Sequence, residues 1–353
     1  MNNKYSERKK SKISSITIYD VAKAAGVSLS TVSRVLNDSD LVGKNTKFKV
    51  QKIMDEMNYI PNQIARGLMN NTSKAIGLII PDIANPFFAE LIQGVEDVAN
   101  KNGFSMFLCN SNYNSEKEKA YMIDMAERRV DGVIIISAFK QDLELIKRLN
   151  KTMKIITIQT RIEEIDGVKT DDQASMKEAI NHLILLGHKK IAFICFDLRG
   201  CKERYKGYTE MLQLNNIQIK EEYIREYSKE CNALYNNKEN MGYIMTKELL
   251  ELPEPPTAIQ AMNDYIASGA YLAIKEKKLS IPKDISIIGF DNISISKLLN
   301  PALTTVSQPI YAMGETGGEL LMKNILDGSN PVPRMIVLPT KFIIRESTAP
   351  PSN

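Results

Sequence analysis

Histidine, cysteine and long apolar runs are scarce in this chain of 353 residues. The two histidines, His182 and His188, do not fall on one helical face, and none of the four cysteines forms a Cys-x-x-Cys pair. These absences predict that the chain carries no structural zinc site, no disulfide scaffold and no resident cofactor. No apolar run approaches the roughly 20 residues that span a bilayer, and the N-terminus lacks the apolar stretch of a secretory signal. We therefore expect a cytoplasmic protein without membrane contacts.

Charge is distributed unevenly along the chain. Residues 1–75 contain 13 Lys and Arg against 6 Asp and Glu, whereas the remaining residues contain 33 against 36. A small basic module therefore precedes a larger, nearly neutral one. A basic module can bind nucleic acid or an anionic membrane surface, or it can simply be a solvated surface, so the motifs have to decide.

Residues 17–60 predict three short helices. A capping box at 17–20 begins the first helix, and Gly26 ends it because glycine adopts the left-handed conformation at little cost. The second helix is expected over 29–37 and the third over about 46–58, each with apolar residues at helical spacing. Two helices joined by a tight Ala-Gly-Val turn form a helix-turn-helix, in which the second helix enters the major groove of DNA.

The exposed start of the second predicted helix supplies most of the candidate DNA contacts. In this motif the N-terminal residues of the second helix lie at base edges, and nearby hydroxyls can bind phosphates. A polar, solvated face is the alternative interpretation. The candidates in this region are Thr17, Tyr19, Ser28, Leu29, Ser30, Thr31, Ser33, Arg34 and Asn37.

A family resemblance is carried by motifs that follow one another in order. They read TIYDVAKAAGVSLSTVSRVLN, MNYIPNQIARGLMN, GLIIPDIANPFFAELIQGVED, VDGVIII, GHKKIAFI, NDYIASGAYLAI, ISIIGFDN and LTTVSQP. Together they resemble the lactose-repressor (LacI) family of bacterial transcription regulators over residues 17 to about 346. The resemblance implies a sequence-specific DNA-binding regulator, most often a repressor, whose operator affinity is controlled by a small molecule. Residues 1–16 fall outside it and are expected to be a disordered basic extension.

The segment after the third helix has the pattern of a hinge. Pro61 pushes the preceding residue out of the helical region, and the stretch 63–69 is too short to be a stable helix alone. A plain linker is the alternative interpretation. The resemblance implies a hinge helix that folds on DNA, with Leu68 as an apolar wedge that kinks the operator from the minor-groove side. The implied hinge contacts to DNA are Asn62, Ala65, Arg66 and Leu68.

From residue 75 onward, short β-rich runs alternate with longer helical stretches. The runs are AIGLII, SMFLCN, GVIIIS, KIITI, KIAFIC, TAIQAM and ISIIGF. This alternation predicts βαβ units with parallel sheets, and about 270 residues are large for one such sheet. The resemblance implies an α/β effector domain of two lobes, like a periplasmic binding protein, that follows an all-α helix-turn-helix headpiece.

The resemblance also places the domain boundaries. The expected segments are the extension 1–16, the DNA-binding domain 17–60, the hinge 61–74, an N-lobe of 75–161 and 295–327, and a C-lobe of 162–294 and 328–346. The chain is thus expected to cross between the lobes near 161, 294 and 327. The sequence after 345 carries no leucine heptads, which favours a dimer over a tetramer.

Loops that follow the predicted strands supply the candidates for the effector site, because ligands of open α/β sheets bind at the carboxyl ends of strands. Phe87 and Phe88 can stack on a sugar ring, and Asp82 and Asn85 can form hydrogen bonds there. Asp171 and Asp172 can cap the helix that begins near Ala174, and one of them can also face the pocket. By resemblance, the further effector contacts are Gln159, Arg204, Asn263 and Asp291.

Carboxylate, amide and guanidinium groups beside aromatic faces suit the vicinal hydroxyls of a sugar or sugar phosphate, with a purine-like molecule as the alternative. The chain departs from the family where Cys195-Phe196-Asp197 replaces small, glycine-like residues, which leaves the ligand size open. Leu29 and Ser30 differ from the base-reading pair of the lactose repressor, so no operator sequence is carried over.

Other function classes fit the sequence poorly. There is no Gly-x-Gly-x-x-Gly after the first strand, no P-loop and no Gly-x-Ser-x-Gly elbow, so we expect no enzyme. The charge run 116–119 is expected to be a solvated helix surface. A sugar-binding protein of a transport system would share the two lobes, but it should carry a signal peptide and lack the helix-turn-helix. The expected partners are operator DNA, a small effector and a second copy of the chain, and a phosphocarrier co-repressor stays open.

Overall fold

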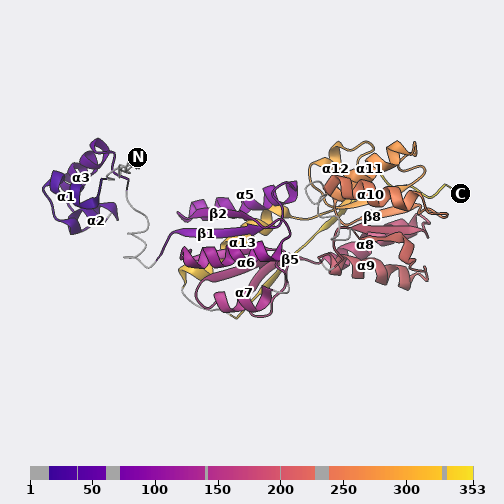
Figure 1. Ribbon diagram of the computed structural model, residues 1–353, viewed down its shortest axis with the longest axis horizontal. Helices are drawn as coiled ribbons and strands as arrows, with labels where there is room; N and C mark the ends of the chain where they lie inside the picture. The colour runs from indigo at the N-terminus through magenta and orange to yellow at the C-terminus, as the bar shows by residue number, and fades with distance from the viewer. Residues whose placement is uncertain are drawn as a thin grey trace, which may run out of the picture. The chain divides into compact units, whose positions relative to one another are not determined.

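The computed structural model describes residues 16–37, 39–60, 72–139, 142–198, 200–226, 238–327 and 332–352 (Figure 1). The chain divides after Ser73 into two compact units, and each is described by itself. Within the described ranges, no helix combines the length and the apolar composition that crossing a bilayer requires.

The first unit contains the three predicted helices, α1 (Ile18–Ala25), α2 (Leu29–Leu36) and α3 (Lys44–Glu56). Thr17 and Asp20 form the expected capping box at the start of α1, and Gly26 ends this helix with φ of 63°. A small core holds the three helices together through Val21, Ala25, Val32, Val50 and Met54. The structure therefore confirms the helix-turn-helix, with α3 beginning and ending two residues earlier than expected.

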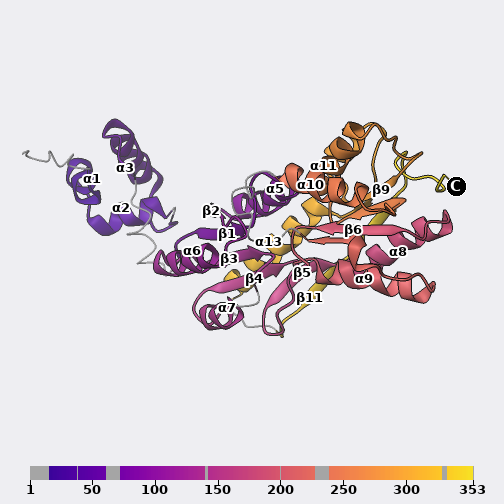
Figure 2. The same ribbon diagram turned by 45° about the vertical axis from the view of Figure 1, so that its right-hand side comes forward.

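The N-lobe of the second unit is built on a parallel sheet in the order β11-β5-β4-β3-β1-β2. Its strands are β1 (Ala75–Ile80), β2 (Ser105–Asn110), β3 (Gly132–Ile136), β4 (Lys154–Ile158), β5 (Asp166–Thr170) and β11 (Met335–Leu338). Helices α5 (Pro86–Lys101) and α13 (Ile310–Leu326) cover one face, and α6 (Ser115–Glu127) and α7 (Leu143–Leu149) cover the other (Figure 2). The central strands β1 and β3 are buried along their whole length, as strands covered on both faces should be.

Helices α5 and α13 approach each other closely because glycines face each other at their contact. A Cβ atom on Gly314 would lie 2.1 Å from the Leu91 carbonyl oxygen, and one on Gly94 would lie 2.4 Å from the Tyr311 carbonyl oxygen. Both distances are shorter than van der Waals contact, so these positions exclude larger residues. The contact joins a helix early in the chain to one that follows most of the C-lobe in the sequence.

The C-lobe contains the second sheet, in the order β12-β10-β9-β8-β6-β7, in which only β12 runs antiparallel to its neighbour among the described strand pairs. Its strands are β6 (Ile191–Cys195), β7 (Ile224–Glu226), β8 (Ala258–Ala261), β9 (Ser286–Asp291), β10 (Thr304–Ser307) and β12 (Lys341–Ile343). Helices α8 (Asp172–Leu185) and α9 (Lys202–Leu214) pack together, as do α10 (Lys238–Leu250) and α11 (Asp264–Glu276), and the short helices η2 (Glu221–Tyr223) and α12 (Ile295–Leu298) complete the lobe.

The chain crosses between the lobes three times, but later than expected each time. The crossings follow β5 near 171, β10 near 308 and β11 near 339, so the expected positions 161, 294 and 327 are wrong. The strand DGVKT pairs with β4 and lies in the N-lobe, although its sequence has no apolar run. The strand TTVS likewise pairs with β9 and extends the C-lobe. Tertiary pairing, rather than local pattern, makes strands of these two segments.

Candidate nucleic-acid interface and effector site

The start of α2 presents the predicted base-reading residues to solvent. Leu29 is 37% exposed, and Ser30 and Arg34 are also exposed. The Ser28 hydroxyl caps the helix by accepting from the Thr31 amide at 3.1 Å, and it lies 2.8 Å from both the Ser30 and the Thr31 hydroxyls. This arrangement leaves hydroxyl and guanidinium groups at the end of the helix that enters the groove in a helix-turn-helix.

The other DNA candidates of the first unit surround this helix end. Thr17 is held by Asp20, whose carboxylate accepts from the Thr17 amide at 2.8 Å. Tyr19 is 68% exposed on α1, Ser33 is half-buried and Asn37 forms the C-cap of α2. The hinge candidates Asn62, Ala65, Arg66 and Leu68 lie outside the described residues, as do residues 1–15 of the basic extension.

Arg204 is the centre of the candidate effector site. It lies in the first turn of α9 and is only 7% exposed. Its Nε donates to Asp172 at 2.8 Å, its Nη1 donates to the Met262 carbonyl oxygen at 2.6 Å, and its guanidinium lies 3.8 Å from the centre of the Phe290 ring. These contacts compensate the buried positive charge of Arg204. Charge-assisted hydrogen bonds of this kind hold the side chain in a fixed orientation.

A ring of polar contacts runs from Arg204 through two of the crossings and back. Asp172 and Gln308 both contact the Thr170 hydroxyl, at 2.6 and 2.8 Å. The Gln308 amide donates to Asp291 at 2.7 Å, and Asp291 Oδ1 lies 3.7 Å from Arg204 Nη2. We call these five side chains the crossing ring. Because Asp172 and Gln308 lie at the first and second crossings, the ring connects the C-lobe site to the segments that join the lobes.

Asp291 is held in an unusual state within the crossing ring. It ends β9 with φ of 108°, a conformation that costs energy for a residue other than glycine. Burial raises the pKa of its carboxyl to about 7, although Arg204 and the hydrogen bond from Gln308 act in the opposite direction. Such strained and perturbed groups cluster at functional sites. This carboxyl can therefore gain or lose its proton near neutral pH.

Tyr113 brings the N-lobe into the same site. It follows the carboxyl end of β2, and its ring contacts the Phe196 ring of the C-lobe edge-on, with centroids 4.7 Å apart. Burial raises the pKa of Tyr113, and the Asp82 and Asp291 carboxylates add to this effect. Two carboxylates from different lobes therefore act on one phenol, so Asp82 and Asp291 both lie near Tyr113.

The remaining effector candidates have structural partners in this conformation. Phe87 and Phe88 lie in the first turn of α5, are 3% and 4% exposed and belong to the N-lobe core, so their role as stacking surfaces stays a prediction. Asn85 and Asn263 cap α5 and α11, by accepting from the amides two and three residues further along the chain. Gln159 accepts a hydrogen bond from the Ser137 hydroxyl at 3.1 Å.

Sequence reasoning missed three members of the site, Thr170, Gln308 and Tyr113, and left the role of Asp172 open. Asp172 was expected either to cap a helix or to face the pocket; Asp171 makes the cap, at 3.0 Å from the Ala174 amide, and Asp172 pairs with Arg204. Gln308 was not foreseen because the second crossing was placed elsewhere. Tyr113 follows a strand end, so the rule that selected Asp82 would also have selected Tyr113.

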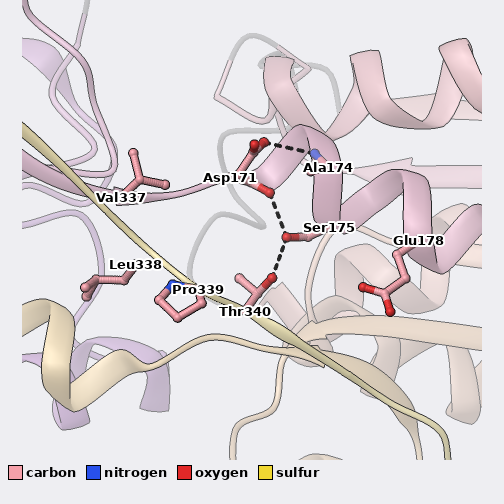
Figure 3. Close-up of a pocket in the computed structure, with 8 residues that line it drawn as sticks. All are labelled: Asp171, Ala174, Ser175, Glu178, Val337, Leu338, Pro339 and Thr340. Atoms are coloured by element: carbon pink, nitrogen blue, oxygen red, sulfur yellow. Dashed lines mark hydrogen bonds between the residues drawn. The ribbon is translucent and has the colours of Figure 1, made fainter.

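A hollow of about 320 Å³ lies where the first and third crossings run side by side (Figure 3). In it the Ser175 hydroxyl donates to the Asp171 carbonyl oxygen at 2.7 Å and lies 2.7 Å from the Thr340 hydroxyl. None of the eight effector candidates lines this hollow. These contacts tie the third crossing to the start of α8, close in sequence to Asp172 of the crossing ring.

The expectation of a solvated charge run at 116–119 is wrong at Glu118. Glu116 and Lys117 are exposed as expected, but Glu118 is 1% exposed and accepts from the Phe139 amide at 3.1 Å. Burial raises the pKa of Glu118 to about 7, and the nearby Asp142 carboxylate adds to this effect. Asp142 is equally buried and accepts from the Ser115 hydroxyl at 2.9 Å. Helix α6 points Glu118 into the lobe, although the charged residues next to it in the sequence suggest an exposed helix face.

Comparison with known proteins agrees with this architecture. Residues 17–62 match the family model of bacterial regulatory proteins of the lacI family, and residues 180–348 match that of a periplasmic binding protein-like domain. The HTH-type transcriptional regulator DegA of Bacillus subtilis is 36% identical over 341 residues, which cover 95% of this chain and 98% of DegA. The chain belongs to the LacI family. It is a transcriptional regulator with a helix-turn-helix headpiece and a two-lobe, periplasmic-binding-protein-like effector domain.

Solved structures of family members are similar over most of the chain. The lac repressor dimer bound to operator and the anti-inducer ONPF has a TM-score of 0.82 and 28% identity, over 95% of this chain and 99% of that one. A LacI family regulator from Enterococcus faecium with bound ribose has a TM-score of 0.68 and 34% identity, over 79% of this chain and 100% of that one.

Proposed function

We propose that this LacI family regulator acts as a homodimer on a pseudo-palindromic operator and that a neutral sugar bound between its lobes controls the operator affinity. The observation that carries the proposal is the crossing ring. It places the buried Arg204 guanidinium beside the buried Asp291 carboxyl at the carboxyl end of β9 and connects both to the segments between the lobes. A ligand that pairs with Arg204 and Asp291 therefore competes with contacts that fix the crossings.

The DNA part of the proposal is supported by the first unit. Leu29, Ser30 and Arg34 are exposed at the helix that reads the major groove in this motif. The related lac repressor structure contains a dimer on its operator. Two copies would place two α2 helices in successive major grooves, and paired hinge segments would insert Leu68 at the centre of the site. Lys and Arg contacts to phosphate should make the affinity fall steeply with salt.

Exposed apolar side chains on the N-lobe support the dimer. Strand β2 lies at the edge of its sheet and leaves Phe107 45% and Leu108 40% exposed. Ile123 of α6 and Ile83, in the loop after β1, are also exposed, at 44% and 58%. Exposed edge strands with apolar side chains invite pairing, and a symmetric dimer covers such an edge with the same edge of a second copy.

The charges of the described site favour a neutral sugar over a sugar phosphate. The negative charges at this site come from three carboxylates, Asp82, Asp172 and Asp291, and the positive charge comes from the guanidinium of Arg204. Carboxylates accept hydrogen bonds from vicinal hydroxyls, but they repel a phosphate dianion. The relative from Enterococcus faecium binds ribose, which is a sugar of this neutral class. A transport-type binding protein is disfavoured, because the first unit has no role in that function.

The effector changes operator affinity only through its different affinities for the two arrangements of the lobes, which typically amounts to ~1–3 kcal/mol of coupling. Whether the sugar weakens or strengthens operator binding depends on which arrangement of the lobes it binds more tightly. In either case the change must pass through the crossings, because they are the covalent connections between the lobes.

The first experiment is selection of the purified chain on a random-sequence duplex library, repeated with neutral sugars and with sugar phosphates. We expect one palindrome to be enriched and its recovery to change with a neutral sugar. In the same assay, Arg204→Ala and Asp291→Ala should retain operator binding and lose the response. Arg128→Ala serves as a matched control, since Arg128 forms only an exposed ion pair with Asp124 on α6.

Three outcomes would contradict the proposal or a part of it. Failure to enrich any sequence, with every sugar and phosphate tested, would remove the operator function. A normal sugar response in both the Arg204 and the Asp291 variants would place the effector elsewhere. A response to sugar phosphates alone would contradict the charge argument while leaving the crossing ring as the site.

A further inference from the structure

The segment that follows β9 carries Asp291 in a conformation that needs support. Asp291 and Asn292 are consecutive residues with φ of 108° and 59°, a region that residues other than glycine occupy at a cost. We call residues 291–296, which run from the end of β9 into α12, the β9–α12 segment. Strained residues persist only where the surrounding structure holds them, so the contacts of this segment show what keeps Asp291 in place.

Arg345, which follows β12, holds the β9–α12 segment through its side chains. Its Nη2 donates to the Asn292 side-chain oxygen at 2.6 Å, and its Nη1 donates to the Ser296 hydroxyl at 3.2 Å and to the Leu303 carbonyl oxygen at 2.6 Å. The Asn292 amide group also donates to the Ser307 hydroxyl of β10 at 3.1 Å. The planar, forked guanidinium thus fixes two residues of the segment relative to each other, which suits arginine better than lysine.

Asp264, the first residue of α11, holds the backbone of the same segment. It is fully buried, and its carboxyl accepts from the Ile293 amide at 2.9 Å and from the Thr305 hydroxyl at 2.5 Å. The packing around it is tight, since a Cβ atom on Gly289 would lie 2.1 Å from Asp264 Oδ1. The segment is therefore attached to a fixed point two residues after Asp291, and the residue between them is the one that Arg345 binds.

The β9–α12 segment contacts both lobes, so these anchors decide which lobe it follows. Ile293 is 3% exposed and belongs to the hydrophobic core of the N-lobe. Arg345 and Asp264, by contrast, lie in the C-lobe, as does Arg204 in α9. Without the anchors, a rearrangement of the lobes would move the segment with the N-lobe and separate the Asp291 carboxyl from Arg204.

We propose that Arg345 is a positioning residue of the effector site. It keeps the β9–α12 segment on the C-lobe, so that the Asp291 carboxyl retains its contacts in the crossing ring while the lobes move. Arg345 does not belong to that ring, so it acts through the Asn292 side chain that it binds. That this placement governs sugar affinity rests on the proposed function, whereas the placement of Asp291 itself does not.

Two mild variants separate this role from a general contribution to folding. Arg345→Lys keeps the positive charge but loses the planar fork. Asn292→Gly removes the side chain that Arg345 binds, and glycine adopts the left-handed backbone conformation of this position without strain. Because Arg345 acts through Asn292, both changes should have the same effect at Asp291, and the double variant should add little to either.

The titration of Asp291 is the direct readout and uses neither sugar nor DNA. The full chain is labelled with carboxyl-13C aspartate, and the Asp291 resonance is assigned from its loss in an Asp291→Asn variant. Burial raises the pKa of Asp291 to about 7 in the wild type. In Arg345→Lys and in Asn292→Gly we expect the midpoint to fall by at least about one pH unit, because the released carboxyl reaches water. Arg128→Ala, which removes an exposed ion pair, should titrate like the wild type.

Sugar affinity is the second readout. Whichever of ribose, glucose and galactose binds the wild type should bind both variants at least about tenfold more weakly, while their operator affinity without sugar should not change. An unchanged Asp291 midpoint in the two variants would overturn the positioning role, even if their melting temperatures fell. Shifts that add in the double variant would overturn the action through Asn292. Absence of sugar binding in the wild type would count against the proposed function alone, because the titration decides the role of Arg345 without sugar.

Discussion

Replacement of Glu118 by glutamine should stabilise the protein at neutral pH, although it removes a charge from a helix rich in charges. Glu118 is buried, and its carboxyl has a pKa of about 7 instead of its usual 4.5. A carboxyl with a raised pKa in the folded state contributes full stability below its unfolded pKa and loses it as the pH rises through the folded pKa. Glutamine keeps the acceptor for the Phe139 amide and has no charge to bury.

The magnitude follows from the shift. From 4.5 to about 7 the pKa changes by about 2.5 units, and each unit corresponds to about 1.4 kcal/mol, so the charged form costs about 3 kcal/mol. The free energies of unfolding of wild type and Glu118→Gln should be similar near pH 4.5. Near pH 7.5 the variant should be more stable by about 3 kcal/mol.

Urea unfolding followed by circular dichroism from pH 4.5 to 8 measures this difference, since the chain has no tryptophan for fluorescence. Glu116→Gln is the matched control, because Glu116 lies on the same helix and its side chain is 80% exposed. Its profile should run parallel to that of the wild type. A parallel profile for Glu118→Gln as well would refute the argument, because it would mean that Glu118 reaches solvent in the folded protein.

Three further changes test other parts of the structure. Leu68→Ala should weaken operator binding at least about tenfold, or ~1.4 kcal/mol, in a salt-matched titration, and an equal loss of sugar affinity would contradict the wedge. Gly314→Ala should lower the melting temperature by several degrees, because its Cβ would lie 2.1 Å from the Leu91 carbonyl oxygen; an unchanged melt would show that α5 and α13 separate easily. Burial lowers the pKa of His188, so the stability it contributes is present above pH 6.5 and is lost as the pH falls. His188→Gln should therefore flatten the acid limb of the stability profile, and an unchanged limb would assign acid unfolding to other groups.

The headpiece could be derived from the sequence because its signals are local. The capping box at Thr17, the left-handed Gly26 and the apolar spacing of three helices act within a few residues of one another. Each signal depends on the geometry of one helical turn, so it can be recognised from the order of the residues alone. The strands β1, β3, β4, β6 and β9 were found for a similar reason, since each is a continuous apolar run that must be covered on both faces.

The remaining strands and the contacts of the candidate site were determined by residues far apart in the chain. The strands Asp166–Thr170 and Thr304–Ser307 have no apolar signature and became strands only because neighbouring strands offered them hydrogen bonds. The crossing ring joins residues up to 138 positions apart, and no spacing rule brings Thr170 to Gln308. Burial of Glu118 depends likewise on how helix α6 lies on its sheet.

The class of the protein, the helix proposed to read DNA and the residue types of the candidate effector site could therefore be derived from the sequence, because propensity, capping and motif order are properties of short segments. Only the tertiary structure decided which strands belong to which lobe, which charges are buried and how Arg204 is connected to the crossings. Those outcomes depend on desolvation and on hydrogen bonds between distant segments, and both quantities exist only once the chain is folded.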